Sequence, residues 1–374
     1  MMKINKLSFL LFNMFAASAF AGNYVDNGSE AIPQNNKGDE HHFYIDVGVN
    51  GYYFDQPSMI LPLSVGYGNT NNGGSFPSTP GDSYNADNWA FNPTLTLGYQ
   101  FLTDNPEIQQ IFGQQNAIEL RVSYFHNSGA QEESYDDQPY YVNNFPITGN
   151  TMFGNNASFV MANSDVNFDN TYAAIGLYYT GAKVVNNHFI NSPYVGVDFN
   201  YLKQNSDYTT LQYIPDYDGQ PILDTPLEGK GSDDLTSYYL GFAFGDKATW
   251  LFANHYGVYG QLGAGLYWLH TTLDASQNPV TNQPDLDDET LLATYTVSTT
   301  DNTATFKLNA ELGFNYYLKG NQDPSSMRVT LLAGIDYWND VAYADNPTQE
   351  GEAVKIGYES SFNPYAGLQL HVPL

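Results

Sequence analysis

Residues 305–338 read TFKLNAELGFNYYLKGNQDPSSMRVTLLAGIDYW and contain two runs of alternating apolar and polar side chains. The first run has an apolar residue at every second position from Phe306 to Leu318, and the second does so from Val329 to Tyr337. Because a β-strand turns successive side chains to opposite faces, each run predicts a strand with one apolar and one polar face. The intervening KGNQDPSS is rich in residues that favour turns. The stretch therefore predicts an antiparallel hairpin.

A two-faced hairpin of this kind fits two classes of protein. A soluble sandwich buries the apolar face against a second sheet and exposes the polar face to water. A transmembrane barrel turns the apolar face to lipid and the polar face to its lumen. The rest of the chain has to distinguish the two classes.

The first 21 residues have the features of a secretory signal peptide. Two lysines precede an apolar run from Leu7 to Phe15, and AFA at 19–21 offers a small-residue cleavage site. The run is shorter than the roughly 20 apolar residues of a membrane-spanning helix. The chain contains no cysteine, which excludes disulfides and thiolate metal sites. We divide the sequence into a signal peptide (1–21), a polar periplasmic leader (22–42) and a barrel (43–374).

The alternation recurs eight more times outside the hairpin, which predicts ten strands of about ten residues, long enough to cross a bilayer at a steep tilt. Short turns, one of them expected around Asp246-Lys247, alternate with long polar connections, as in barrels with short periplasmic turns and long extracellular loops. A count of twelve would require residues 291–297 to cross the membrane. The predicted fold is all-β, a single transmembrane antiparallel up-and-down barrel with strands at 43–53, 93–103, 118–124, 170–180, 194–201, 238–244, 258–268, 306–318, 328–338 and 365–374.

The last ten residues, YAGLQLHVPL, alternate again. In this spacing they resemble the closing strand of Gram-negative outer-membrane barrels. Four segments, HFYIDVGVNGYYF, WAFNPTLTLGYQF, AIELRVSYFHN and RVTLLAGIDYWNDVAYAD, give the chain a looser resemblance to the Legionella-type major outer membrane protein family. That resemblance implies a porin-like barrel in the bacterial outer membrane, with exposed acidic loops that also bind host or other surface ligands.

The charge of the chain is strongly acidic and unevenly distributed. The formal net charge is −28, which disfavours binding to nucleic acid. The five long connections, taken as 54–92, 127–169, 204–234, 270–302 and 339–363, hold 27 of the 40 acidic residues but only two lysines. We therefore expect an acidic cell surface that contacts outer-membrane lipid and lipopolysaccharide, with divalent cations as bridges.

The polar faces of the predicted strands carry a set of charged side chains, including both arginines of the chain. Five acids against three bases predict a charged constriction for passive, weakly cation-favouring passage of ions or small polar solutes. Adjacent strands would pair Glu311 with Arg328 or Lys307 with Asp336. The predicted lumen residues are Asp46, Glu119, Arg121, Asp198, Lys307, Glu311, Arg328 and Asp336.

The alternative is a non-conducting surface barrel for adhesion or envelope stabilisation. Barrels of about eight strands are filled by side chains, whereas clearly open porins have about sixteen, so ten strands leave both readings open. A bore filled by the two arginines and the lumen tyrosines would favour the alternative. Glycines on the polar faces favour the open lumen, at positions 48, 98, 176, 196, 263, 265 and 313.

Other chemistries have weaker support. The acidic runs that contain Asp216, Asp218, Asp285 and Asp287 suit calcium or magnesium, although neither has the twelve-residue ligand spacing of a calcium-binding loop. His270 and Asp274 are the one pair comparable with the Asp–His pair of omptin proteases, but the omptin Asp-x-His spacing is absent. No Gly-x-Ser-x-Gly motif is present. We expect neither an enzyme nor a cofactor, and the solute and the oligomeric state stay open.

Overall fold

The computed structural model describes residues 41–61, 63–67, 78–80, 83–84, 88–134, 140–144, 158–186, 188–213, 227–281, 294–320, 326–347 and 352–374. The predicted signal peptide, almost all of the leader and the four aspartates of the possible metal sites lie outside these ranges. No helix in the described part of the chain is long and apolar enough to cross a membrane.

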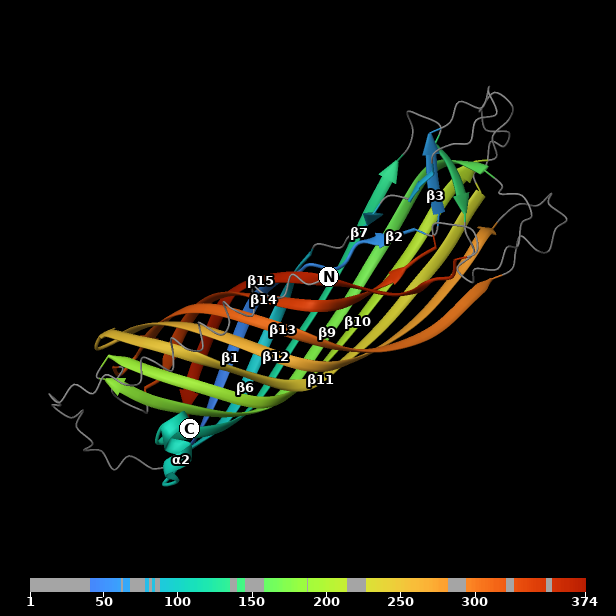
Figure 1. Ribbon diagram of the computed structural model, residues 1–374. Helices are drawn as coiled ribbons and strands as arrows, with labels where there is room; N and C mark the ends of the chain where they lie inside the picture. Colours follow the sequence, from blue (N-terminus) through green and yellow to red (C-terminus); the bar gives the residue numbers. More distant parts are fainter. Residues whose placement is uncertain are drawn as a thin grey trace.

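Ten long antiparallel strands form a closed ring (Figure 1). Each strand pairs with the next in the chain, and the last pairs with the first, for example at Val47 and Leu370. The predicted ten-stranded up-and-down barrel is confirmed, and residues from Tyr295 onward belong to one of the ten strands. The strands are β1 (His42–Phe54), β6 (Asn88–Leu102), β7 (Gln115–Ser134), β9 (Ser158–Asn186), β10 (Phe189–Tyr213), β11 (Leu227–Ala253), β12 (Tyr256–Thr281), β13 (Tyr295–Tyr317), β14 (Arg328–Asp345) and β15 (Lys355–Pro373).

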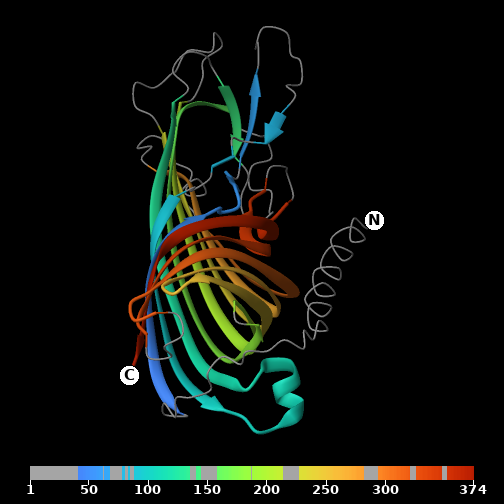
Figure 2. The same cartoon turned by 90° about the vertical axis from the view of Figure 1, so that its left-hand side faces the viewer.

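The two ends of the barrel differ in their connections. The C-terminus and helix α2 (Pro106–Phe112) lie at one end, and β3 lies at the opposite end (Figures 1 and 2). The strands are joined at the first end by 103–114, 187–188, 254–255 and 318–327, and at the second end by 55–87, 135–157, 214–226, 282–294 and 346–354. The additional short strands are β2 (Met59–Ile60), β3 (Leu63–Tyr67), β4 (Ser78–Pro80), β5 (Ser83–Tyr84) and β8 (Tyr140–Asn144).

The short turn between β11 and β12 lies elsewhere than predicted. Asp246 and Lys247 are inside β11, where Lys247 is opposite Gln261 of β12, and the chain turns at 254–255 instead. The polar pair was misread as a turn because Asp246 interrupts the apolar outer face. That face continues with Trp250 and Phe252, both exposed.

An apolar belt surrounds the barrel wall. Outward side chains such as Leu312, Phe242 and Leu266 are 71%, 66% and 65% exposed. Apolar exposure on this scale is the surface that a transmembrane barrel turns to lipid, so these segments are the membrane-spanning part. The prediction that the apolar faces point outward is confirmed.

Beyond the belt, toward the long connections, the two faces exchange their chemistry. On β12 the outward side chains are apolar up to Trp268, and then polar at His270 and Asp274. The inward side chains Leu269 and Leu273 are apolar and fully buried. The geometric alternation of the strand is unchanged.

This exchange explains why strand lengths were underestimated. The predicted loops at 127–169, 204–234, 270–302 and 339–363 contain strand extensions, so that β9 has 29 residues and β11 has 27. An alternation with an apolar outer face marks only the part of a strand next to lipid, and outside the membrane the outer face is polar. We call the extended part, beyond the belt, the outer half of the barrel.

The glycines of the polar faces do not widen the lumen. A Cβ atom on Gly98 would lie within 3.0 Å of the Tyr44 ring, and one on Gly313 would meet the Tyr259 ring equally closely. Tyr178 covers Gly176 in the same way. Six of the seven predicted glycines, all except Gly48, give room for an inward tyrosine, and this indicates a filled interior rather than an open one.

Candidate functional site

The interior of the membrane-spanning part contains a polar chamber of about 610 Å³ at the short-turn end. A second space of about 280 Å³ adjoins it and shares Arg121, Asp198 and Glu311 as lining residues. All eight predicted lumen residues line one or both spaces. The structure thus places the whole set on the inner wall, and their functional role stays a proposal.

Neither predicted ion pair forms. Glu311 is opposite Gly334, and Lys307 is opposite Trp338, so the β13–β14 register separates the expected partners. Register depends on the turn and on packing across the whole barrel, which one hairpin sequence does not reveal.

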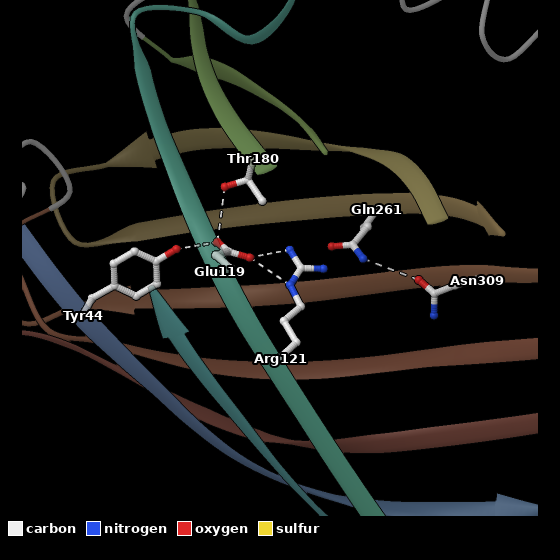
Figure 3. A network of polar contacts seen from close by, with 6 residues as sticks. All are labelled: Tyr44, Glu119, Arg121, Thr180, Gln261 and Asn309. Carbon is white, nitrogen blue, oxygen red and sulfur yellow. Dashed lines mark hydrogen bonds and ion pairs between the residues drawn. The ribbon is translucent and has the colours of Figure 1, made fainter. Parts of the chain in front are cut away.

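Glu119 is the centre of one polar network (Figure 3). It accepts hydrogen bonds from the Tyr44 hydroxyl and from Thr180 at 3.3 Å. Arg121, two residues along the same strand, donates to Glu119 from Nε at 2.8 Å and from Nη2 at 2.6 Å. The guanidinium also lies 4.2 Å from the centre of the Tyr178 ring. Glu119 and Arg121 therefore neutralise each other within the chamber wall.

Tyrosine hydroxyls bind most of the other lumen carboxylates. Glu311 accepts from Tyr259 at 2.7 Å and from Tyr365 at 2.9 Å. Asp198 accepts from Tyr267 at 2.9 Å. These bonds hold the rings across the lumen, where their glycine neighbours leave them space.

Two further carboxylates have amide or imidazole partners. Asp336 accepts from Asn309 at 2.7 Å. Asp46 lies 2.6 Å from Nδ1 of His371 on the neighbouring strand. Sequence reasoning placed His371 on the polar face of the last strand but did not include it in the site, because a lone histidine there carries no further signal.

Lys307 lies within a group of aromatic rings. Its Nζ donates to Asn200 at 3.1 Å and lies 3.6 Å from the Trp338 ring centre and 4.1 Å from that of Tyr239. Cation–π contacts of this kind partly offset the loss of water around a buried ammonium group. Lys307 is therefore held by packing and not by an ion pair.

Lys247 is a lumen residue that the sequence interpretation missed. It lines the chamber, and its Nζ lies 3.7 Å from the centre of the Tyr259 ring. The misassigned turn removed it from the predicted set. A strict continuation of strand parity from Ala243 through Gly245 would have placed Lys247 inside.

A cluster of buried aromatic rings, the septum, lies between the chamber and the outer half. We define the septum as Tyr52, Phe54, Phe125, Tyr172, Tyr239 and Trp338, all of them buried. The centre of the Trp338 ring is 5.3 Å from the centre of the Tyr172 ring and 5.8 Å from that of the Tyr239 ring. Because β14 and β9 are five strands apart in either direction around the ring of ten, the contact of Trp338 with Tyr172 crosses the full bore.

The outer half is filled above the septum by an apolar cluster. It includes Leu235, Leu273 and Ala342, which face inward from β11, β12 and β14. Asp233 lies on the same inner face of β11, outside the membrane-spanning part. It is 1% exposed and accepts from Asn346 at 2.8 Å. Burial raises the pKa of the Asp233 carboxyl to about 7.

The remaining candidate chemistry does not assemble into a site. His270 and Asp274 both lie on the outer face of β12, and His270 bonds Asn302 at 2.9 Å. No group of three or more potential metal ligands occurs in the described ranges.

Comparisons with known proteins give no family assignment. No family model matches the chain, and no curated protein matches it either. The likeness to the Legionella-type family therefore stays a resemblance, whereas the barrel fold that it implied is confirmed.

Among solved structures, the outer membrane protease OmpT from Escherichia coli is 8% identical, with a TM-score of 0.36, over 89% of this chain and 97% of the other. The Pseudomonas putida toluene transporter TodX is 9% identical, with a TM-score of 0.22, over 89% and 90%. A Pseudomonas aeruginosa FadL homologue has 9% identity and a TM-score of 0.21 over the same shares. Scores this low support no argument about activity.

The surface and the strand pairing of the chain indicate its location in the cell. A closed antiparallel ring and an apolar belt are features of bacterial outer-membrane barrels. The protein is an outer-membrane β-barrel.

Proposed function

We propose that the protein is a channel-type barrel whose lumen is closed at rest by the aromatic septum. The contact between Trp338 and Tyr172 supports this most directly, because it joins opposite walls of the ring at 5.3 Å. Ions and small polar solutes would enter the chamber from the short-turn end, and passage to the other side would require displacement of the septum.

We propose a weaker preference for cations than the sequence suggested. The lining of the two inner spaces includes five carboxylates and, once Lys247 is counted, four lysine or arginine side chains. Charges this nearly balanced favour neither sign strongly. The reversal potential in a potassium chloride gradient measures the preference.

Single-channel recording in a planar bilayer tests the closed lumen. The refolded wild-type barrel should show no sustained conductance, and Trp338→Ala should produce discrete open steps because it removes the ring that bridges the bore. Trp268→Ala is the matched control, since Trp268 is exposed on the lipid-facing side of β12 and should leave the bilayer silent. Circular dichroism and heat-modified gel mobility would verify that each barrel is folded.

Sustained wild-type steps would contradict the closed lumen and favour the open pore predicted from the sequence. Silence of both the wild type and the Trp338 variant would instead favour the second candidate, a surface barrel for adhesion or envelope stabilisation. Its support is the tall outer half, whose strands continue well past the apolar belt. Lipopolysaccharide and surface ligands of the acidic connections would then be the partners to test.

A further inference from the structure

Two cations of the chamber, Lys247 and Arg328, have no carboxylate partner. Within the described ranges no ion pair includes either residue, whereas Arg121 is paired with Glu119. The Nε atom of Arg328 is buried without a hydrogen-bond partner. Leaving charged groups in a restricted interior without a direct ion-pair partner is costly, so their position needs an explanation.

The nearest acids are already bound. Glu311 accepts from two tyrosine hydroxyls, one of them that of Tyr259, whose ring lies against Lys247. Asp46 lies 2.6 Å from His371, which faces Arg328 in the β14–β15 ladder. Neither carboxylate is within ion-pair distance of Lys247 or Arg328.

Lys247 and Arg328 come from separate strands, β11 and β14, and line the same chamber. Two like charges repel unless an anion lies between them. The centre of the Tyr259 ring is 3.7 Å from the Lys247 ammonium, and that of the Tyr317 ring is 6.0 Å from the Arg328 guanidinium.

We propose that the chamber binds a small oxyanion between Lys247 and Arg328. A guanidinium presents a planar set of donors that matches the oxygens of such a group, and a lysine adds a compact charge from the other side. The free Nε of Arg328 supplies one of these donors. The chamber of about 610 Å³ leaves ample room for the anion and its remaining water.

This site does not depend on the proposed gating. Binding occurs on the short-turn side of the septum, so it takes place whether or not the lumen opens. A barrel that conducts steadily could still bind the anion, and a silent barrel could fail to do so.

Isothermal titration of inorganic phosphate into the refolded barrel, in non-ionic detergent at constant ionic strength, tests the proposal. We expect saturable binding of one phosphate per chain. Lys247→Met and Arg328→Met should each weaken it at least about tenfold, the factor that corresponds to loss of one charge-assisted contact. Lys355→Met is the control, because Lys355 is exposed outside the chamber and paired with Asp345 at 3.2 Å.

Arg328→Lys is the control for a folding defect in Arg328→Met, because it keeps the charge and removes only the planar donor set. It should bind more weakly than the wild type and more tightly than Arg328→Met. Absence of saturable binding at millimolar phosphate would overturn the proposal. Equal binding by the wild type and both methionine variants would also overturn it.

Discussion

The membrane-spanning half and the outer half of the barrel use the same strands but turn opposite chemistry inward. Next to lipid, the interior holds carboxylates, cations and tyrosine hydroxyls around the polar chamber. Beyond the belt, Leu235, Leu269 and Leu273 face inward and are buried in apolar clusters. The comparison shows that the solvent around the wall decides which face is apolar. Where lipid surrounds the wall, the apolar side chains face outward, and where water surrounds it, they face inward.

Leu269→Ala should weaken the outer half most. Leu269 is 0% exposed inside β12, so truncation leaves a cavity that costs about 2–5 kcal/mol. Leu266→Ala is the matched control three residues away, on the lipid-facing side. Urea unfolding of both variants in detergent micelles, followed by tryptophan fluorescence, measures the difference. An equal loss for both would mean that the outer half has no packed core.

Asp233 is a buried carboxyl of the outer half, and its effect on stability depends on pH. Its folded pKa of about 7 exceeds that of an ordinary carboxyl, so the folded state favours the protonated form. The unfolded chain is already ionised at pH 5, and stability therefore falls as the pH rises from 5 to 8. The loss should be about 2–3 kcal/mol from this residue.

Asp233→Asn tests that assignment. The variant should remove this part of the pH dependence, because asparagine keeps a side-chain oxygen for Asn346 without a charge. The measurement is the urea midpoint at pH 5, 6, 7 and 8. A pH profile parallel to that of the wild type would assign the titration to another group.

Gly98→Ala tests the filled interior of the membrane-spanning half. The new Cβ would overlap the Tyr44 ring, and displacing a ring from a packed wall costs about 1–3 kcal/mol. Gly260→Ala is the control on the outer face, where the Cβ would meet only a leucine methyl at 3.5 Å. Thermal unfolding in detergent would separate the two. A neutral Gly98→Ala would show that Tyr44 has free space to move.

The sequence predicts the lipid-facing strands well, because every second side chain there faces lipid and is therefore apolar. It also places the eight charged residues on the inner wall, since strand parity alone decides that. It does not predict that Trp338 contacts Tyr172, because this contact depends on the closed ring and not on neighbours in sequence. For the same reason Glu311 has tyrosine partners where an arginine was expected.

Helix α2 was not predicted, although the sequence contains residues typical of helix boundaries at both of its ends. Helix α2 begins after Asn105, whose side chain accepts from the backbone N–H groups of Glu107 and Ile108. Pro106 occupies its first turn, and Gly113 follows its end with a φ of 83°. Asn before Pro and a later Gly are ordinary helix boundaries, and they were read only as a connection.

The pairing of β1 with β15 has a consequence for assembly. The contact between Asp46 and His371 joins residues that are 325 positions apart, because β1 and β15 are the first and last strands of the ring. Until it forms, both end strands present unpaired backbone groups that other chains can bind. Closure across so long a separation is slow for entropic reasons. The unclosed intermediate, rather than the finished barrel, is therefore the state most in need of protection by chaperones.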